Sequence, residues 1–97
     1  MERPALEGRS ILVIEHEADV ALQLRDRFRG AGAKVFAAAR LREAQHMAEH
    51  PALSAVVIGL RIGSESTAAV CRRLSHLGIP FMFHTRYDPA EAQRLWP

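Results

Sequence analysis

Short apolar runs alternate along the chain with longer segments in which apolar residues recur every three or four positions. The first run, Ile11 to Ile14, is continuous rather than alternating, as expected for a central strand buried on both faces of a parallel sheet. The pattern predicts four strands, over residues 11–14, 34–38, 55–58 and 79–85. Strands that alternate with helical segments are typical of βα units and a parallel sheet.

The longer segments predict four helices, each with its own end signal. Leu24 and Phe28 belong to the apolar face of the first, which we expect to pack on the sheet and to end near Gly30 and Gly32. The second is short, must stop near Pro51, and is expected to pack weakly. The third ends at Gly78. The fourth covers residues 90–96 and is preceded by Asp88 as its N-cap and Pro89 at its first helical position.

Four strands and four helices in strict alternation predict an open, doubly wound, three-layer α/β domain. Function in such sheets sits at the carboxyl ends of the strands. The residues delivered there are Glu15, His16, Gly59, Thr85, Arg86 and Tyr87.

Composition adds limits. The 97 residues, 48% apolar and 25% charged, predict one domain over 1–97 with an N-terminal extension over 1–9. No apolar stretch approaches the roughly 20 residues of a membrane span, and no secretory signal is recognisable, so we expect a cytoplasmic protein. The lone Cys71 predicts a buried, inert thiol. A net charge of +2, with Arg residues spread over several helices, favours a solvated surface over a nucleic-acid-binding patch.

Two segments carry a resemblance to a known family. Residues 11–17, Ile-Leu-Val-Ile-Glu-His-Glu, followed by a helix, resemble the opening of the receiver domains of two-component response regulators. Residues 80–88 are similar to the Phe-Ala-Thr-Gly-Tyr segment of a single-domain receiver subgroup known from alphaproteobacteria. The resemblance covers residues 9–96. It implies a flavodoxin-like sheet, here with four strands and four helices and without the family's fifth strand and helix.

The resemblance also implies a phosphorylation site that this chain has lost. The family's acidic pair corresponds to Glu15 and His16, its phosphoacceptor Asp to Gly59, and its switch residues to Thr85 and Tyr87. Glycine has no nucleophile, so no acyl phosphate can form at that position. Imidazole suits Mg²⁺ poorly, and no residue matches the family's strand 5 Lys. We therefore expect a degenerate pseudo-receiver that is not an enzyme, has no catalytic residues and no cofactor, and does not bind Mg²⁺.

Other histidines and a glycine-rich stretch have two interpretations each. His46 and His50, four residues apart, could supply half of a metal site, or lie on a solvated helix face. His16 and Glu15 could bind a transition metal with Tyr87, or His16 could cap the entrance of the first helix. Residues 30–34 resemble a phosphate loop but follow a helix and precede a strand, which is the reverse of the order required.

Two functions remain open. The first is an interaction module of phosphorelay signalling that docks to a protein partner, such as a histidine kinase or another regulator, or forms a homodimer. We expect its interface at the last strand, which is an apolar sheet edge, together with the last helix and the exposed flank of the first helix. Phe81, Phe83 and Trp96 are expected among its buried anchors. The alternative is a receiver-like domain that binds a small anion or a metal at the strand-end pocket formed by Glu15, His16, Thr85 and Arg86.

Overall fold

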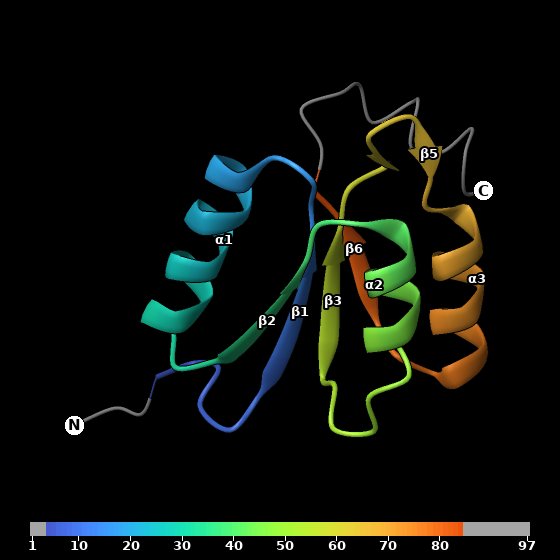
Figure 1. Cartoon of the computed structure of the whole chain (residues 1–97). Helices are drawn as coiled ribbons and strands as arrows, with labels where there is room; N and C mark the ends of the chain where they lie inside the picture. The colour runs from blue at the N-terminus through green and yellow to red at the C-terminus, as the bar shows by residue number, and fades with distance from the viewer. Residues whose placement is uncertain (1–3, 85–97) are drawn as a thin grey trace.

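A four-stranded parallel sheet forms the centre of the molecule. The computed structural model describes residues 4–84, and its sheet has the strand order β2-β1-β3-β6 (Figure 1). The four predicted strands are confirmed, although the last is shorter than the predicted range 79–85. The proline at position 80 has no N–H to donate to a neighbouring strand, so the regular strand begins after it. The strands are β1 (Ser10–Ile14), β2 (Lys34–Ala38), β3 (Ala55–Ile58) and β6 (Phe81–Phe83).

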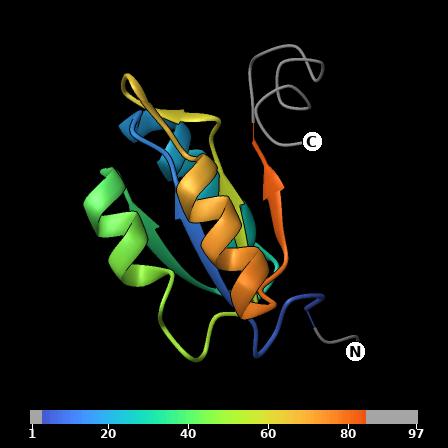
Figure 2. The same ribbon diagram turned by 90° about the vertical axis from the view of Figure 1, so that its right-hand side faces the viewer.

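Three helices cover the two faces of this sheet. Helix α1 (Ala18–Gly30) lies on one face, and α2 (Leu41–Met47) and α3 (Ala68–Leu77) lie on the other (Figures 1 and 2). The predicted three-layer, doubly wound architecture is therefore confirmed. Helix α3 ends at Gly78, whose φ of 73° is the left-handed conformation that glycine adopts without strain. The helix predicted over 90–96 lies outside the described residues.

Alternate residues of β1 enter two separate cores. Leu12 and Ile14 belong to the larger core beneath α2 and α3, and Val13 to the smaller core beneath α1. Leu24 and Phe28 pack against the smaller core, as predicted. The expectation that the second helix packs weakly was wrong. Its small side chains let it approach the sheet closely, and Ala44 and the following Ala48 are at most 1% exposed.

A small hairpin stands where the sequence predicted only a loop. Strands β4 (Arg61–Ile62) and β5 (Glu65–Ser66) pair antiparallel across a turn that contains Gly63 with a φ of 63°. Ile62 is 7% exposed and joins the larger core, so the hairpin is anchored to the domain. Two-residue strands are too short to show a periodic pattern, which explains why the sequence did not predict them.

Residues 4–9, which precede β1, are part of the packed domain. The Leu6 N–H donates to the carbonyl of Ala31 at 2.8 Å, and the Leu6 side chain packs against the smaller core. Gly32 has a φ of 98°, and a Cβ there would lie 2.7 Å from Cβ of Pro4. A glycine at position 32 therefore allows the segment to cross the end of α1. Within residues 4–84, no helix is long and apolar enough to cross a membrane.

Candidate functional site

The carboxyl ends of β1 and β3 lie side by side, as the sequence predicted. The Gly59 N–H donates to the Ile14 carbonyl at 3.0 Å, and the His84 N–H donates to the Ile58 carbonyl at 2.9 Å. These bonds place Glu15, Gly59 and His84 at one edge of the sheet. Thr85, Arg86 and Tyr87, expected at the same edge, lie outside the described residues.

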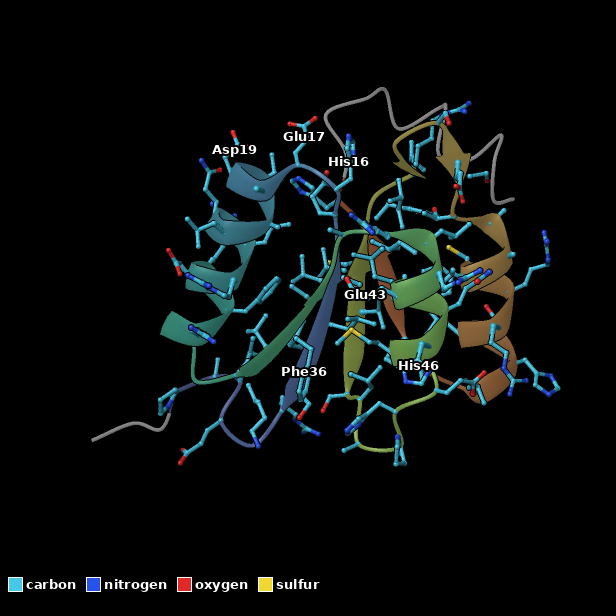
Figure 3. All side chains as sticks on the ribbon, viewed as in Figure 1. His16, Glu17, Asp19, Phe36, Glu43 and His46 are labelled. Carbon is cyan, nitrogen blue, oxygen red and sulfur yellow. The ribbon has the colours of Figure 1, made fainter. Side chains whose placement is uncertain are left out.

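The Glu15 carboxylate is buried and turned into this edge. Glu15 is 9% exposed, and its Oε1 accepts the backbone N–H of Glu17, the residue before α1, at 3.2 Å. The same oxygen lies 3.5 Å from Nδ1 of His16, whose side chain is 41% exposed (Figure 3). The start of α1 has no side-chain cap from His16, and Glu15 instead accepts the backbone N–H of Glu17 just before the helix.

Gly59 lies directly beneath the Glu15 carboxylate. A Cβ built at Gly59 would lie 3.2 Å from Oε2 of Glu15 and 3.4 Å from the Arg61 carbonyl oxygen. The first of these distances is shorter than an ordinary van der Waals contact, so a side chain at position 59 would require the Glu15 carboxylate to shift by a few tenths of an ångström. An additional carboxylate there would also meet the negative charge of Glu15, which is costly in a partly dehydrated site.

Thr67 holds the loop that follows Gly59, and sequence reasoning missed it. Its side chain is 1% exposed, and its hydroxyl oxygen lies 2.7 Å from the Gly59 carbonyl oxygen and 2.9 Å from that of Leu60. The single hydroxyl proton is shared between these two acceptors. Thr67 precedes the first residue of α3, a position where threonine commonly caps a helix, and that was the available signal. Here the hydroxyl instead ties the start of α3 to the end of β3.

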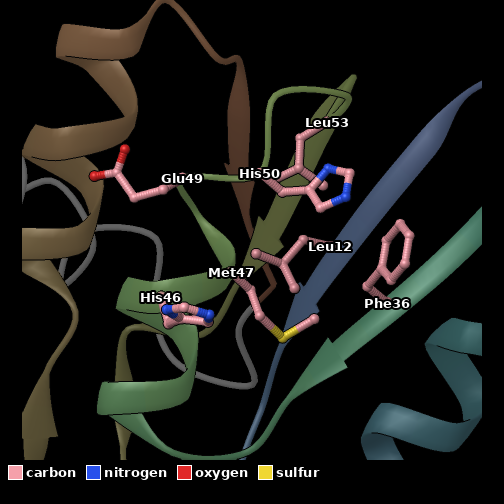
Figure 4. Close-up of a pocket in the computed structure, with 7 residues that line it drawn as sticks. All are labelled: Leu12, Phe36, His46, Met47, Glu49, His50 and Leu53. Atoms are coloured by element: carbon pink, nitrogen blue, oxygen red, sulfur yellow. The ribbon is translucent and has the colours of Figure 1, made fainter.

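His46 and His50 face a separate, mainly apolar cavity on the α2 side of the sheet. The cavity has a volume of about 260 Å³ (Figure 4). Nδ1 of His50 accepts the Ala52 N–H at 3.2 Å, and its ring centroid lies 5.5 Å from that of Phe36. The residues that line the cavity are Leu12, Phe36, His46, Met47, Glu49, His50 and Leu53.

Glu49, the acidic residue that lines this cavity, forms an ion pair with Arg73. Glu49 accepts Nε of Arg73 at 2.6 Å, and this hydrogen bond lowers the pKa of the Glu49 carboxyl below its ordinary value. Within residues 4–84, no three His, Cys, Asp or Glu side chains are grouped so that they could hold a metal ion. His46 and His50 are both exposed, as the solvated-face interpretation expected, and they also line this cavity.

Comparison with known proteins places this geometry in a structural class. No protein-family model and no curated protein sequence matches the chain. Among solved structures, the non-phosphorylated HemR receiver domain from Leptospira biflexa superposes with a TM-score of 0.74 at 19% identity, over 91% of this chain and 76% of that one. This chain has the receiver-domain fold. The receiver domain of a Francisella response regulator superposes with a TM-score of 0.69 at 14% identity, over 90% of this chain and 75% of that one. The receiver domain of the hybrid histidine kinase CckA superposes with a TM-score of 0.63 at 18% identity, over 89% of this chain and 94% of that one.

The sequence resemblance assigned Gly59 to the phosphoacceptor position and Glu15 and His16 to the acidic pair. In this chain β3 ends at Ile58, and the next residue, Gly59, follows at the edge where Glu15 and His16 also lie. The position expected to carry the phosphoacceptor thus offers only backbone, covered by the carboxylate of the neighbouring strand.

Proposed function

We propose that this chain is a non-phosphorylatable receiver-like domain that acts through protein–protein interaction in two-component or phosphorelay signalling. The observation that carries the proposal is the pairing of Gly59 with Glu15. Position 59 has no nucleophilic side chain, and Oε2 of Glu15 lies 3.2 Å from the point where such a side chain would begin. A domain with a receiver's fold and a closed acceptor position can still present a receiver's surfaces to a partner.

Phosphorylation is the direct test of this proposal. The purified chain, incubated with acetyl phosphate and Mg²⁺, should show no added phosphoryl group in an intact-mass spectrum, because no acyl phosphate can form at Gly59. A phosphorylatable receiver domain treated in parallel should gain the expected mass. A stable phosphoryl adduct on this chain would contradict the proposal.

The partner surface that we propose is the face of β3 and β6 next to α1. Helix α1 packs on β1 and β2, and a shallow apolar hollow of about 240 Å³ lies beside it over the outer strands. Two strands are roughly 10 Å wide, about the diameter of one helix. Phe28, Val57 and Met82 line this hollow, and Met82 is 62% exposed.

The side chains of β6 alternate between the two faces of the sheet. Phe81 and Phe83 pack against the larger core on the α3 side, half-buried, while the intervening Met82 points to the opposite face. Their role as interface anchors stays a prediction, as does that of Trp96, which lies outside the described residues. Among the described strands β2 and β6 form the two edges of the sheet, and residues 80–84 at the β6 edge include no Lys, Arg, Asp or Glu to oppose pairing. We therefore propose a second copy of this chain as the first partner to test.

The alternative of an anion held at the strand-end pocket has less support. A mutant of the MaeR response regulator has been solved bound to sulfate, and it matches this chain with a TM-score of 0.75 at 13% identity. In this chain, however, the buried carboxylate of Glu15 lies over the end of β3 and would repel an anion there. We retain the interaction module as the proposed function.

A further inference from the structure

A second hollow at the same edge of the sheet differs in charge from the position at Gly59. This cleft, which we call the basic cleft, lies beyond the ends of β1 and β2 and is closed on one side by the β4–β5 hairpin. Its volume is about 680 Å³, within the range of small-molecule sites. Three stretches of chain build it, and the residues that line it are His16, Ala39, Arg40, Leu41, Arg42, Gln45, Ile62, Gly63 and Glu65.

The wall of the basic cleft carries two arginines that form no ion pair within residues 4–84. Arg40 and Arg42 are exposed there, and like most arginines of residues 4–84, but unlike Arg25 and Arg73, they form no ion pair with a carboxylate. Glu65 is the only acid that lines the cleft among the described residues. The cleft thus has an excess of positive charge, and guanidinium groups bind phosphate and carboxylate through paired N–H donors.

The connection that carries the two arginines is held by a hydrogen bond of its own. Oε1 of Glu43 accepts the backbone N–H of Ala39 at 2.8 Å, which closes the turn between β2 and α2. The acid nearest to the arginines therefore binds the backbone rather than a guanidinium. This bond fixes the turn on which Arg40 stands and leaves both guanidinium groups available to a ligand.

The floor of the basic cleft is apolar. Ile62 is 7% exposed and belongs to the larger core, and Leu41 is half-buried against the same core. A ligand that is only an ion would leave this floor in contact with water, while one with an apolar body would cover it. Charged donors on the rim and apolar side chains beneath them are the usual composition of a site for a small organic molecule.

We propose that the basic cleft binds a small organic anion, a phosphate or carboxylate carried on a compact apolar body. The anionic group lies between Arg40 and Arg42, and the body covers Leu41 and Ile62. This site is separate from the acceptor position at Gly59 and does not depend on the proposed interaction function. If the chain proved not to bind this ligand, the proposed interaction function would be unaffected, and the reverse also holds.

Titration of the full chain, followed by amide chemical shifts in two-dimensional NMR spectra, tests the proposal. The ligands are phenyl phosphate, benzoate, inorganic phosphate and the neutral analogue phenol. Phenyl phosphate or benzoate should give saturable shifts at residues 39–45 and 62–65, and the stronger of the two identifies the preferred anionic group. Inorganic phosphate should bind at least tenfold more weakly, and phenol should not saturate.

Variants of the arginines provide the second arm. Arg40→Gln and Arg42→Gln should each weaken binding of the preferred ligand by about tenfold, since each removes a charged donor while keeping most of the length of the side chain. Arg29→Gln, a change at an exposed arginine on α1, is the matched control and should leave affinity unchanged. The proposal is overturned if no ligand saturates at millimolar concentration, if phenol binds as well as the anions, or if the control loses as much affinity as the cleft variants.

Discussion

Oε2 of Glu15 lies 3.2 Å from the point at which a side chain on Gly59 would begin, so the two residues share one space at the edge of the sheet. The glycine leaves room for the carboxylate, and the carboxylate is held there by the Glu17 N–H. The two positions are therefore energetically coupled, and changes at one should depend on the residue at the other.

Restoring an acid at position 59 should destabilise the protein. Gly59→Asp places a second carboxylate against that of Glu15, and we expect it to lower the free energy of unfolding by roughly 1–3 kcal/mol more than the isosteric, neutral Gly59→Asn. In a Glu15→Gln background the difference between Asp and Asn should largely disappear. Urea unfolding of the four variants measures the coupling, and an Asp–Asn difference that persists without the Glu15 charge would show that the two residues do not interact as described.

The hydroxyl of Thr67 should contribute more to the free energy of unfolding than its methyl group does. Thr67→Val keeps the shape of the buried side chain but leaves the carbonyls of Gly59 and Leu60 without their donor, at a cost of about 1–3 kcal/mol in the free energy of unfolding. Thr67→Ser retains the donor and is the control, losing only the packing of a methyl. If serine proves the more damaging replacement in thermal or urea unfolding, packing rather than hydrogen bonding dominates at this position.

Self-association should depend on Met82. Sedimentation at micromolar concentration should show a dimer for the parent chain, and Met82→Lys should shift it to monomer, because a charge would be brought into the apolar contact between two β6 strands. Leu77, 38% exposed on α3 on the opposite side of the sheet, supplies the control Leu77→Lys, which should leave the dimer intact. A parent chain that sediments as a folded monomer would remove the second copy as partner.

The Cys71 thiol should be protected in the folded protein. Burial raises its pKa from the ordinary value of 9.0 to about 11, partly offset by the hydrogen bond with Thr67. At pH 8 the thiolate fraction is then about a hundredfold lower than in the unfolded chain, and iodoacetamide should alkylate Cys71 at least that much more slowly. Equal rates of alkylation with and without denaturant would show that the thiol is accessible.

The same shift predicts a loss of stability at high pH. The folded state holds the Cys71 proton more tightly than the unfolded state, so this contribution is fully present below about pH 9 and is lost as the pH rises toward 11. Cys71→Ala should flatten that part of the stability profile. Urea midpoints measured from pH 8 to 11 for both proteins check the prediction, which fails if the two profiles run parallel.

Local patterns in the sequence were enough to predict the main strands and helices and the absence of a nucleophile at position 59. Residues 34–38 and 55–58 are strands with the predicted bounds. The second is a run buried on both faces, which has a distinct composition. The end of α3 at Gly78 followed from the conformational freedom of glycine. That Gly59 offers no nucleophile needs no structure, since it is a property of the residue type alone.

Only the tertiary structure decided which side chains meet. Glu15 lies 44 residues before Gly59 in the chain, and they share one space because β1 and β3 are paired in the sheet. The basic cleft joins residues that follow β1, β2 and β3, and Thr67 returns to carbonyls seven and eight residues earlier. Periodicity reports which face of an element is buried, but strand order and side-chain rotamers set long-range contacts, and these depend on the packing of the whole domain.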